Sequence, residues 1–265
     1  INWLVKNKIK RSHKLIAIGG GIIQDITCFI SATLLRGVDW YFIPTTLLSQ
    51  ADSCIGSKSS INSNNVKNIL GTFTPPNEIF ICTKFLLSLK NIDIKSGIGE
   101  MLKVHAIAGP KTFISIKKNY NDLFINKVTL IKIIYKSLQI KKKFIEIDEF
   151  DKGPRNIFNY GHSFGHAIER ATSFKIPHGI AVTIGCDLAN FTSMKLGLLQ
   201  KDIYLSMQET LQKNYFEFKD VIIPRDLFFD ALEKDKKNID NKSFSLVLPN
   251  KDGRIFIDHY KNNKK

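Results

Sequence analysis

Short apolar runs alternate with helix-length segments in the first third of the chain. The run at 15–18 is followed by three glycines at 19–21 and by a helix-length segment at 22–35. Further strand-like runs lie at 40–43 and at 78–82. Because strands that alternate with helices usually pair in parallel, this order predicts an α/β layer with a parallel sheet.

The pattern changes near residue 92. Long amphipathic segments at 94–108, 130–146 and 163–172 predict helices, and the next clear strand signal lies at 243–248. We therefore expect an α/β then mainly α fold: a dinucleotide-binding α/β domain at 1–91 and a mainly helical domain at 92–265. The first motif comes within about twenty residues of Ile1, which suggests an incomplete Rossmann-like layer that lacks its N-terminal strands.

Composition narrows the class of protein. The 265 residues are 43% hydrophobic, enough for a substantial core, and carry a net charge of +15. That charge raises the alternative of a nucleic-acid or membrane-surface protein. Most lysines lie in mixed Lys/Asn/Ile stretches such as 117–127, which are typical of solvated faces, so we expect neither partner. Four widely spaced cysteines without a CxxC pair favour a reducing cytoplasm.

The glycine run lies where the first strand meets the first helix. Such a turn offers backbone N–H groups and a helix N-terminus to a phosphate. The GxGxxG spacing is absent, so a tight turn without a ligand is an equal alternative.

Two histidines four residues apart, His162 and His166, project from one face of a predicted helix. His178 follows, and Glu100 lies in the amphipathic segment 97–106. Imidazole and carboxylate together suit zinc or a similar divalent ion. The alternative is a hydrogen-bonded surface pair; without His-Glu-x-x-His, peptidase chemistry is not supported.

Cationic candidates surround these motifs. Lys58 ends a loop of small residues at 52–58 that suits an anion, and Arg155 and Asn159 directly precede the histidine pair. The other candidates are Lys67 with Asn68, Lys103 and Lys141. Lysine is abundant in this chain, so abundance alone favours a solvent-exposed position for each lysine, and only its setting in a motif points to a site.

Taken together, the motifs resemble in their order the 3-dehydroquinate synthase family of sugar phosphate cyclases, over about residues 15–248. The anchors are Gly19-Gly20-Gly21 with Asp25, Arg36-Gly37, 44–48, 52–58, Lys67-Asn68, Ser96-Gly97 with Glu100 and Lys103, 155–166, and His178-Gly179.

The resemblance implies roles for individual residues. The metal ligands, of zinc or cobalt, would be Glu100, His162 and His178, and His166 would be a catalytic or phosphate-contacting residue. Positions that hold NAD would be Gly20, Gly21, Ile22, Asp25, Thr45, Thr46, Ser88 and Asp52, together with Lys58 and Lys67. Asp52 would also touch the substrate. The substrate pocket would include Lys58, Asn68, Lys103, Lys141, Arg155, Asn159 and, more loosely, Lys67 and Lys236. Arg36 would be lent across the interface of a homodimer.

The implied reaction oxidises a ring hydroxyl with NAD, eliminates phosphate, returns the hydride, and closes a carbocycle by an intramolecular aldol step. The expected substrate is a seven-carbon sugar acid phosphate. Three positions depart from the family pattern: Ile180 replaces a usual Glu, and Gln24 and Ser57 replace Gly. Alternatives are a cyclase of neutral sugar phosphates, a metal-dependent glycerol or alcohol dehydrogenase, and a basic binding module.

Overall fold

A three-stranded parallel sheet forms the first layer of the protein. The computed structural model describes residues 1–63, 66–234 and 243–261. The strands β1 (Leu15–Gly19), β2 (Trp40–Pro44) and β5 (Glu78–Ile79) lie in the order β1-β2-β5. Both pairings are parallel, which confirms the predicted α/β layer. The third strand is shorter than the predicted run at 78–82.

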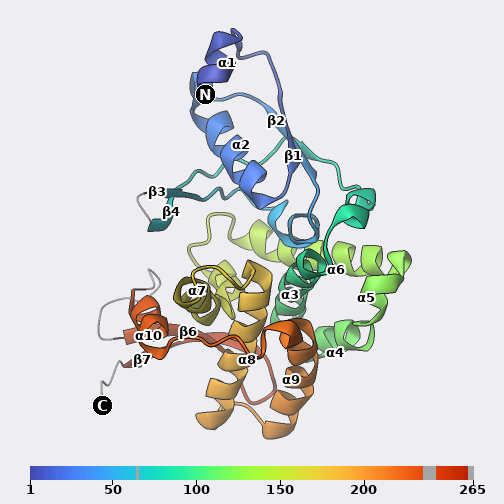
Figure 1. Cartoon of the computed structure of the whole chain (residues 1–265), viewed down its shortest axis with the longest axis vertical. Coiled ribbons are helices and arrows are strands. Elements are labelled where there is room, and N and C mark those ends of the chain that lie inside the picture. The colour runs from blue at the N-terminus through green and yellow to red at the C-terminus, as the bar shows by residue number, and fades with distance from the viewer. Residues whose placement is uncertain (64–65, 235–242, 262–265) are drawn as a thin grey trace.

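Helix α2 (Gly21–Thr33) follows β1 through the glycine turn, as predicted, and packs against β1 and β2 (Figure 1). A hairpin of two short antiparallel strands was not predicted. The remaining elements of this part are α1 (Asn2–Lys6), η1 (Leu34–Arg36), η2 (Ser49–Ser53), β3 (Ile61–Ser63), β4 (Val66–Leu70) and η3 (Thr83–Ser88).

The rest of the described chain is mainly helical and lies below the sheet in Figure 1. Its elements are α3 (Asn91–Ile107), α4 (Pro110–Lys118), α5 (Asp122–Ile125), α6 (Lys127–Ile147), η4 (Pro154–Asn159), α7 (His162–Ala171), α8 (His178–Lys195), α9 (Lys201–Tyr215), η5 (Phe216–Phe218), α10 (Arg225–Glu233), β6 (Ser243–Pro249) and β7 (Ile255–Lys261). The last two strands form an antiparallel hairpin.

Helix α3 is buried on all sides from Ser96 to Ile107. The prediction of an amphipathic segment at 97–106 is therefore wrong. The reason is that η2, α6 and α8 cover this helix together, so its polar residues face other protein groups instead of solvent. The polar side chains of α3 are consequently placed inside the molecule, where they need partners.

Strand β1 is an edge of the three-stranded sheet among the described residues. Two of its side chains, Ile16 and Ile18, are 64% and 58% exposed. Within the same described ranges, no helix combines the length and the apolar character needed to cross a bilayer.

Candidate active site

Close helix packing brings three elements to one point. The backbone of Gly179, at the start of α8, lies so near α3 that a Cβ there would overlap the Ser96 carbonyl oxygen. On α7, a Cβ at Gly165 would lie 3.0 Å from the Val182 Cα of α8. Side chains at these positions would separate the helices. The glycines therefore allow α3, α7 and α8 to present side chains to a shared site.

Four predicted residues meet there. One ligand atom from each of His162, His166 and His178 lies within 4.8 Å of the others. The Oε1 atom of Glu100 lies 3.3 Å from Nε2 of His178 and 3.8 Å from Nε2 of His162. The structure thus brings together all three predicted metal ligands and the histidine that was assigned a separate role.

The charges in this cluster are strongly coupled. Glu100 is 1% exposed, and its Oε2 atom lies 2.5 Å from Nζ of Lys103. Burial alone would raise the pKa of Glu100, but the Lys103 ammonium and both neighbouring histidines hold this pKa well below its usual range. Burial also opposes the charge on Lys103, yet Glu100 and then Asp52 keep the pKa of Lys103 above its usual value.

The two nearest histidines differ. Burial and the Lys103 charge lower the pKa of His162 well below its usual range. Burial acts the same way on His178, but the Glu100 and Glu169 carboxylates beside its two ring nitrogens outweigh it and raise the pKa of His178 to about 9. Without a metal ion, the two carboxylates therefore favour the protonated form of His178, whereas burial favours the neutral form of His162.

The cluster fits a divalent cation. Both carboxylate oxygens of Glu100 are buried, and neither accepts a hydrogen bond of acceptable geometry from the described residues. Imidazole nitrogens and a carboxylate oxygen are the donors that zinc and cobalt prefer. A cation would satisfy the Glu100 oxygens and replace the proton on His178.

An anion cavity of about 170 Å³ lies where α2 meets η2 and the end of α6. Its lining residues are Gly21, Gln24, Asp25, Ser53, Ile55, Gly56, Lys58, Lys141 and Arg155. A Cβ at Gly21 would meet no atom within 4 Å, so the turn leaves open space beside the α2 N-terminus. This arrangement suits a phosphate, because backbone N–H groups at a helix start carry partial positive charge.

An acidic segment, residues 148–151, pairs with the cations of this cavity. The Lys58 ammonium forms an ion pair with Asp151, and Arg155 donates to the Glu149 carbonyl oxygen at 2.5 Å. The Asp148 carboxylate accepts from the backbone N–H groups of Lys152, Gly153 and Arg155 at 2.8 to 3.1 Å. The sequence interpretation missed these acidic partners, although the run directly precedes Arg155.

Asp52 links the anion cavity to the histidine cluster. Lys141 donates to the Asp52 carbonyl oxygen at 2.6 Å, and its Nζ lies 3.2 Å from Asp52 Oδ1. The same carboxylate raises the pKa of Lys103, which pairs with Glu100. Lys103 and Lys141 are 3% and 8% exposed, so the general alternative of solvent-exposed lysines does not hold for them.

Other predicted NAD positions gather at the carboxyl ends of β1 and β2. The backbone N–H of Thr45 donates to the Gly19 carbonyl oxygen, and a Cβ at Gly20 would lie 2.9 Å from Thr46 Cγ2. Asp25 on α2 accepts from the backbone N–H of Ser60 at 3.0 Å, and burial raises the pKa of Asp25 to about 6. These contacts place the glycine turn beside the second strand, as a nucleotide site requires.

The remaining predicted residues lie outside both clusters or next to them. Asn159 is half-buried at the end of η4, three residues before His162. Exposed positions are Ile22 at the start of α2, Arg36 in η1, Asn68 in β4 and Ser88 in η3. The side chain of Lys67 and the whole of Lys236 lie outside the described part of the chain.

The three departures from the family pattern have structural roles. The Gln24 amide donates to the Ser53 carbonyl oxygen at 2.6 Å and accepts from the Ser53 hydroxyl at 2.7 Å. Ser57 donates to the Glu149 carboxylate. Ile180 is fully buried in an apolar cluster and presents no carboxylate to the metal ligands.

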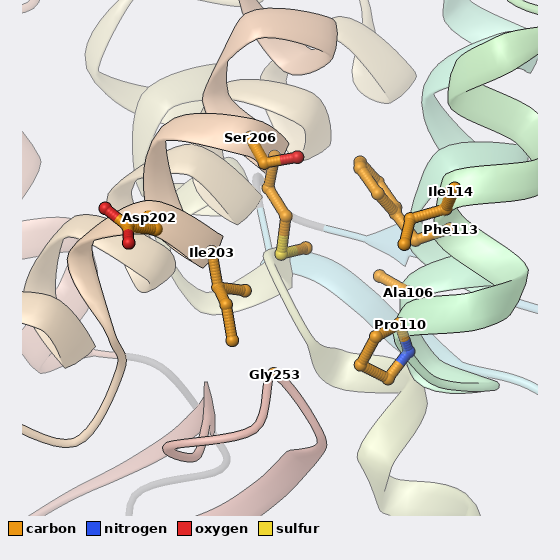
Figure 2. A pocket seen from close by; sticks show the side chains of 9 residues that line it. Ala106, Pro110, Phe113, Ile114, Asp202, Ile203, Ser206 and Gly253 are labelled. Carbon is orange, nitrogen blue, oxygen red and sulfur yellow. The ribbon is translucent and has the colours of Figure 1, made fainter.

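A second cavity, of about 220 Å³, lies far along α3 between α4, α9 and the β6–β7 turn (Figure 2). Its lining is mostly apolar and includes Phe113, Ile203 and Met207. Among the described residues that line this cavity, Asp202 is the one with a charged side chain, and Figure 2 shows its carboxylate directed away from Pro110 and Ala106. This cavity therefore lacks the groups that phosphate chemistry needs.

Comparison with known proteins decides the family. The pattern of the 3-dehydroquinate synthase N-terminal domain matches residues 1–96, and that of the C-terminal domain matches residues 97–238. The chain belongs to the 3-dehydroquinate synthase family. Relatives include the 3-dehydroquinate synthases of Clostridium tetani (38% identical, 93% of this chain and 66% of that protein) and Campylobacter fetus (38%, 94% and 71%). The chain thus spans about two thirds of the length of these relatives.

Solved structures confirm the 3-dehydroquinate synthase fold. A 2-deoxy-scyllo-inosose synthase complexed with carbaglucose-6-phosphate, NAD+ and Co2+ superposes with a TM-score of 0.85 at 22% identity, over 98% of this chain and 74% of that one. The 2-epi-5-epi-valiolone synthase of Streptomyces hygroscopicus with NAD+ and Zn2+ bound gives 0.85 at 24% identity, over 100% and 73%. An iron-containing alcohol dehydrogenase from Thermotoga maritima gives 0.61 at 13% identity, over 89% and 72%.

Proposed function

We propose that the protein is a 3-dehydroquinate synthase-like lyase, which eliminates phosphate from a seven-carbon sugar acid phosphate and closes the product into a carbocycle. The observation that carries this proposal is that Asp52 connects two groups of charged residues. It forms an ion pair with Lys141 of the anion cavity beside the glycine turn, and its charge also acts on Lys103, which pairs with Glu100 of the histidine cluster. Membership of the 3-dehydroquinate synthase family supports the same reaction.

The cations would bind the two anionic ends of the substrate. Arg155 and Lys141 are buried and border the cavity, so they lose little solvation when an anion binds between them. Lys58 is 42% exposed at the mouth, where it would exchange Asp151 for the substrate. Holding both ends would fix the reacting carbons against the histidine cluster.

Two cofactors fit the residues present. NAD would be held at Gly20, Gly21, Ile22, Asp25, Thr45, Thr46, Asp52, Lys58, Lys67 and Ser88, and zinc or cobalt at Glu100, His162 and His178. When bound, NAD supplies reversible hydride transfer and the metal polarises hydroxyl and carbonyl oxygens. His166 would remain available to move a proton or to contact phosphate, as would Asn159, which lies beside the cluster in sequence.

A metal-dependent glycerol or alcohol dehydrogenase is the second candidate. The likeness of the fold to the iron-containing alcohol dehydrogenase favours it. A small polyol, however, carries no anionic group that Lys58, Lys141 and Arg155 around the cavity could bind. An acidic, phosphorylated substrate matches the positive charges of the cavity better than a polyol does. It also matches them better than a neutral sugar phosphate, which lacks the carboxylate.

The predicted homodimer and the predicted further strands of the NAD-binding layer are also part of this proposal. The edge position of β1 supports continuation of the NAD-binding layer by further strands, and the exposed Ile16 and Ile18 leave one face of this strand uncovered. Exposed Arg36, in η1, would reach a second subunit in a homodimer. The four cysteines are unpaired, which agrees with a reducing cytoplasm.

The test is phosphate release from 3-deoxy-arabino-heptulosonate 7-phosphate by the zinc- or cobalt-loaded protein with NAD, with NADH absorbance followed in the same cuvette. Phosphate release without net NADH would support the cyclase. Steady NADH growth on glycerol without phosphate release would support the dehydrogenase. Release only from a neutral sugar phosphate would move the substrate to another branch of the cyclases.

A further inference from the structure

Glu169 is a buried carboxylate that the sequence interpretation did not single out. It lies on α7, seven residues after His162 and three after His166, so all three side chains belong to the same helical face. The residue is 4% exposed. A carboxylate at such a depth destabilises the fold unless a charged or hydrogen-bonding partner compensates it.

His178 is a partner of Glu169. The Oε1 atom of Glu169 lies 3.2 Å from Nδ1 of His178, while the other ring nitrogen, Nε2, lies 3.3 Å from Oε1 of Glu100. The imidazole of His178 is therefore held at both nitrogens. The contact with Glu169 has hydrogen-bond geometry, in which Nδ1 carries the hydrogen and the carboxylate accepts, whereas the contact of Nε2 with Glu100 does not. A neutral ring with its hydrogen on Nδ1 therefore presents the Nε2 lone pair to Glu100 and the other histidines.

The neighbouring ring has a different kind of support. Nδ1 of His162 lies 3.4 Å from the carbonyl oxygen of Tyr160. That contact is longer and comes from the backbone, which no side-chain substitution removes. His178 is also more exposed than His162, at 34% against 15% of the side chain. Packing alone constrains His178 less, so its orientation depends more on the Glu169 carboxylate.

We propose that Glu169 is a positioning residue, which fixes the tautomer and ring orientation of His178 and thereby sets the metal affinity of the histidine cluster. This inference rests on the proposed metal site. A carboxylate behind a ligating histidine makes the imidazole a stronger donor and prevents ring rotation, and loss of such a partner typically lowers metal affinity 10- to 100-fold. Glu169 itself makes no proposed contact with metal or substrate.

Four proteins test the proposal: the wild type, Glu169→Gln, Glu169→Ala and the control Glu146→Gln. Glu146 lies on α6, is 57% exposed and pairs with Lys142, so its variant changes the same chemical group away from the cluster. Each purified full chain is titrated with Co2+ against a competing chelator, and the visible absorption bands of the bound ion are recorded. Urea unfolding of the metal-free proteins measures the structural effect separately.

For Glu169→Ala we expect a 10- to 100-fold weaker Co2+ affinity and altered visible bands. Glu169→Gln keeps the volume and an oxygen acceptor but not the charge, so its affinity should fall between the Ala variant and the wild type. Glu146→Gln should match the wild type. If Glu169→Ala does not fold, the Co2+ affinity of Glu169→Gln relative to the wild type decides, because that variant preserves the packing.

Wild-type affinity and unchanged bands in the folded Glu169 variants would overturn the inference while leaving the metal site intact. The inference also fails if these variants lose stability in urea but bind Co2+ as the wild type does, since Glu169 would then be purely structural. Failure of the wild type itself to bind Co2+ would overturn the proposed metal site and this inference with it.

Discussion

The buried pair of Glu100 and Lys103 gives the sharpest prediction about stability. The two charged atoms are 2.5 Å apart, with 2% and 3% of their side chains exposed. At an effective dielectric constant of about 20, their attraction is on the order of 7 kcal/mol, and desolvation offsets much of it. Removing one partner from such a pair costs about 3–5 kcal/mol, because the other charge stays buried.

Replacing Lys103 with Met should therefore lower the free energy of unfolding of the metal-free protein by about 3–5 kcal/mol. Urea unfolding followed by circular dichroism measures this loss. The double variant Lys103→Met/Glu100→Gln should lose about 1–3 kcal/mol less than the sum of the two single variants, since it leaves no unpaired charge. Lys142→Met removes an exposed partner of Glu146 and should change the midpoint little.

Zinc should reduce the loss in Lys103→Met, because a cation bound to Glu100 replaces part of the missing positive charge. A loss below about 1 kcal/mol in the metal-free variant would refute the reasoning. Such a value would mean that solvent or a neighbouring group already compensates the Glu100 carboxylate.

Three other perturbations follow from the structure. Burial lowers the pKa of His105 from 6.5 to about 4, so His105 binds a proton more readily in the unfolded chain than in the folded one. The free energy of unfolding should therefore fall by about 3 kcal/mol as pH drops from 6.5 to 4, and His105→Gln should flatten this pH dependence in urea titrations. Gly56 has φ +100°, and a Cβ added there would lie 2.6 Å from Arg155 Nη2. Because Gly56→Ala would strain the backbone and displace Arg155, it should lower the melting temperature and raise the KM for an acidic substrate. Lys141→Met should raise that KM at least tenfold, measured by phosphate release, whereas an unchanged KM would remove Lys141 from the pocket.

Local sequence patterns predicted much of the fold. The apolar runs at 15–18 and 40–43 became β1 and β2, and the long periodic segments became α3, α6 and α7, because hydrophobic periodicity and glycine turns are local signals. The β3–β4 hairpin was missed, because its strands are short and mix apolar with polar residues without a regular alternation. The burial of α3 was also missed, since it depends on coverage from η2, α6 and α8, which are distant in sequence.

The candidate site was predictable where chemistry and spacing coincide. His162 and His166 are four residues apart on a helix, and this spacing alone places them together. His178 and Glu100 come from other helices, and only the resemblance to the 3-dehydroquinate synthase family assigned them. Glu169 could have been found, because its spacing from His162 and His166 puts it on the same helical face.

The pairing of Lys58 with Asp151 could not be predicted, since nothing local relates residues 93 positions apart. The same holds for Lys141 and Asp52, which only the packing of α6 against η2 brings together. Long-range polar contacts of this kind depend on the final arrangement of the helices. A sequence pattern can therefore identify a charged residue as a candidate, but it does not show which residue that candidate will pair with.

Metal analysis of three purified proteins tests the proposed metal site most directly. We predict one zinc or cobalt ion per chain in the wild type and in His166→Ala, and none in His162→Ala, with phosphate release lost in both variants. Because all three histidines lie within 4.8 Å of one another, a site of three imidazoles is the competing arrangement. Loss of the metal from His166→Ala, or full occupancy in His162→Ala, would contradict a site made of Glu100, His162 and His178.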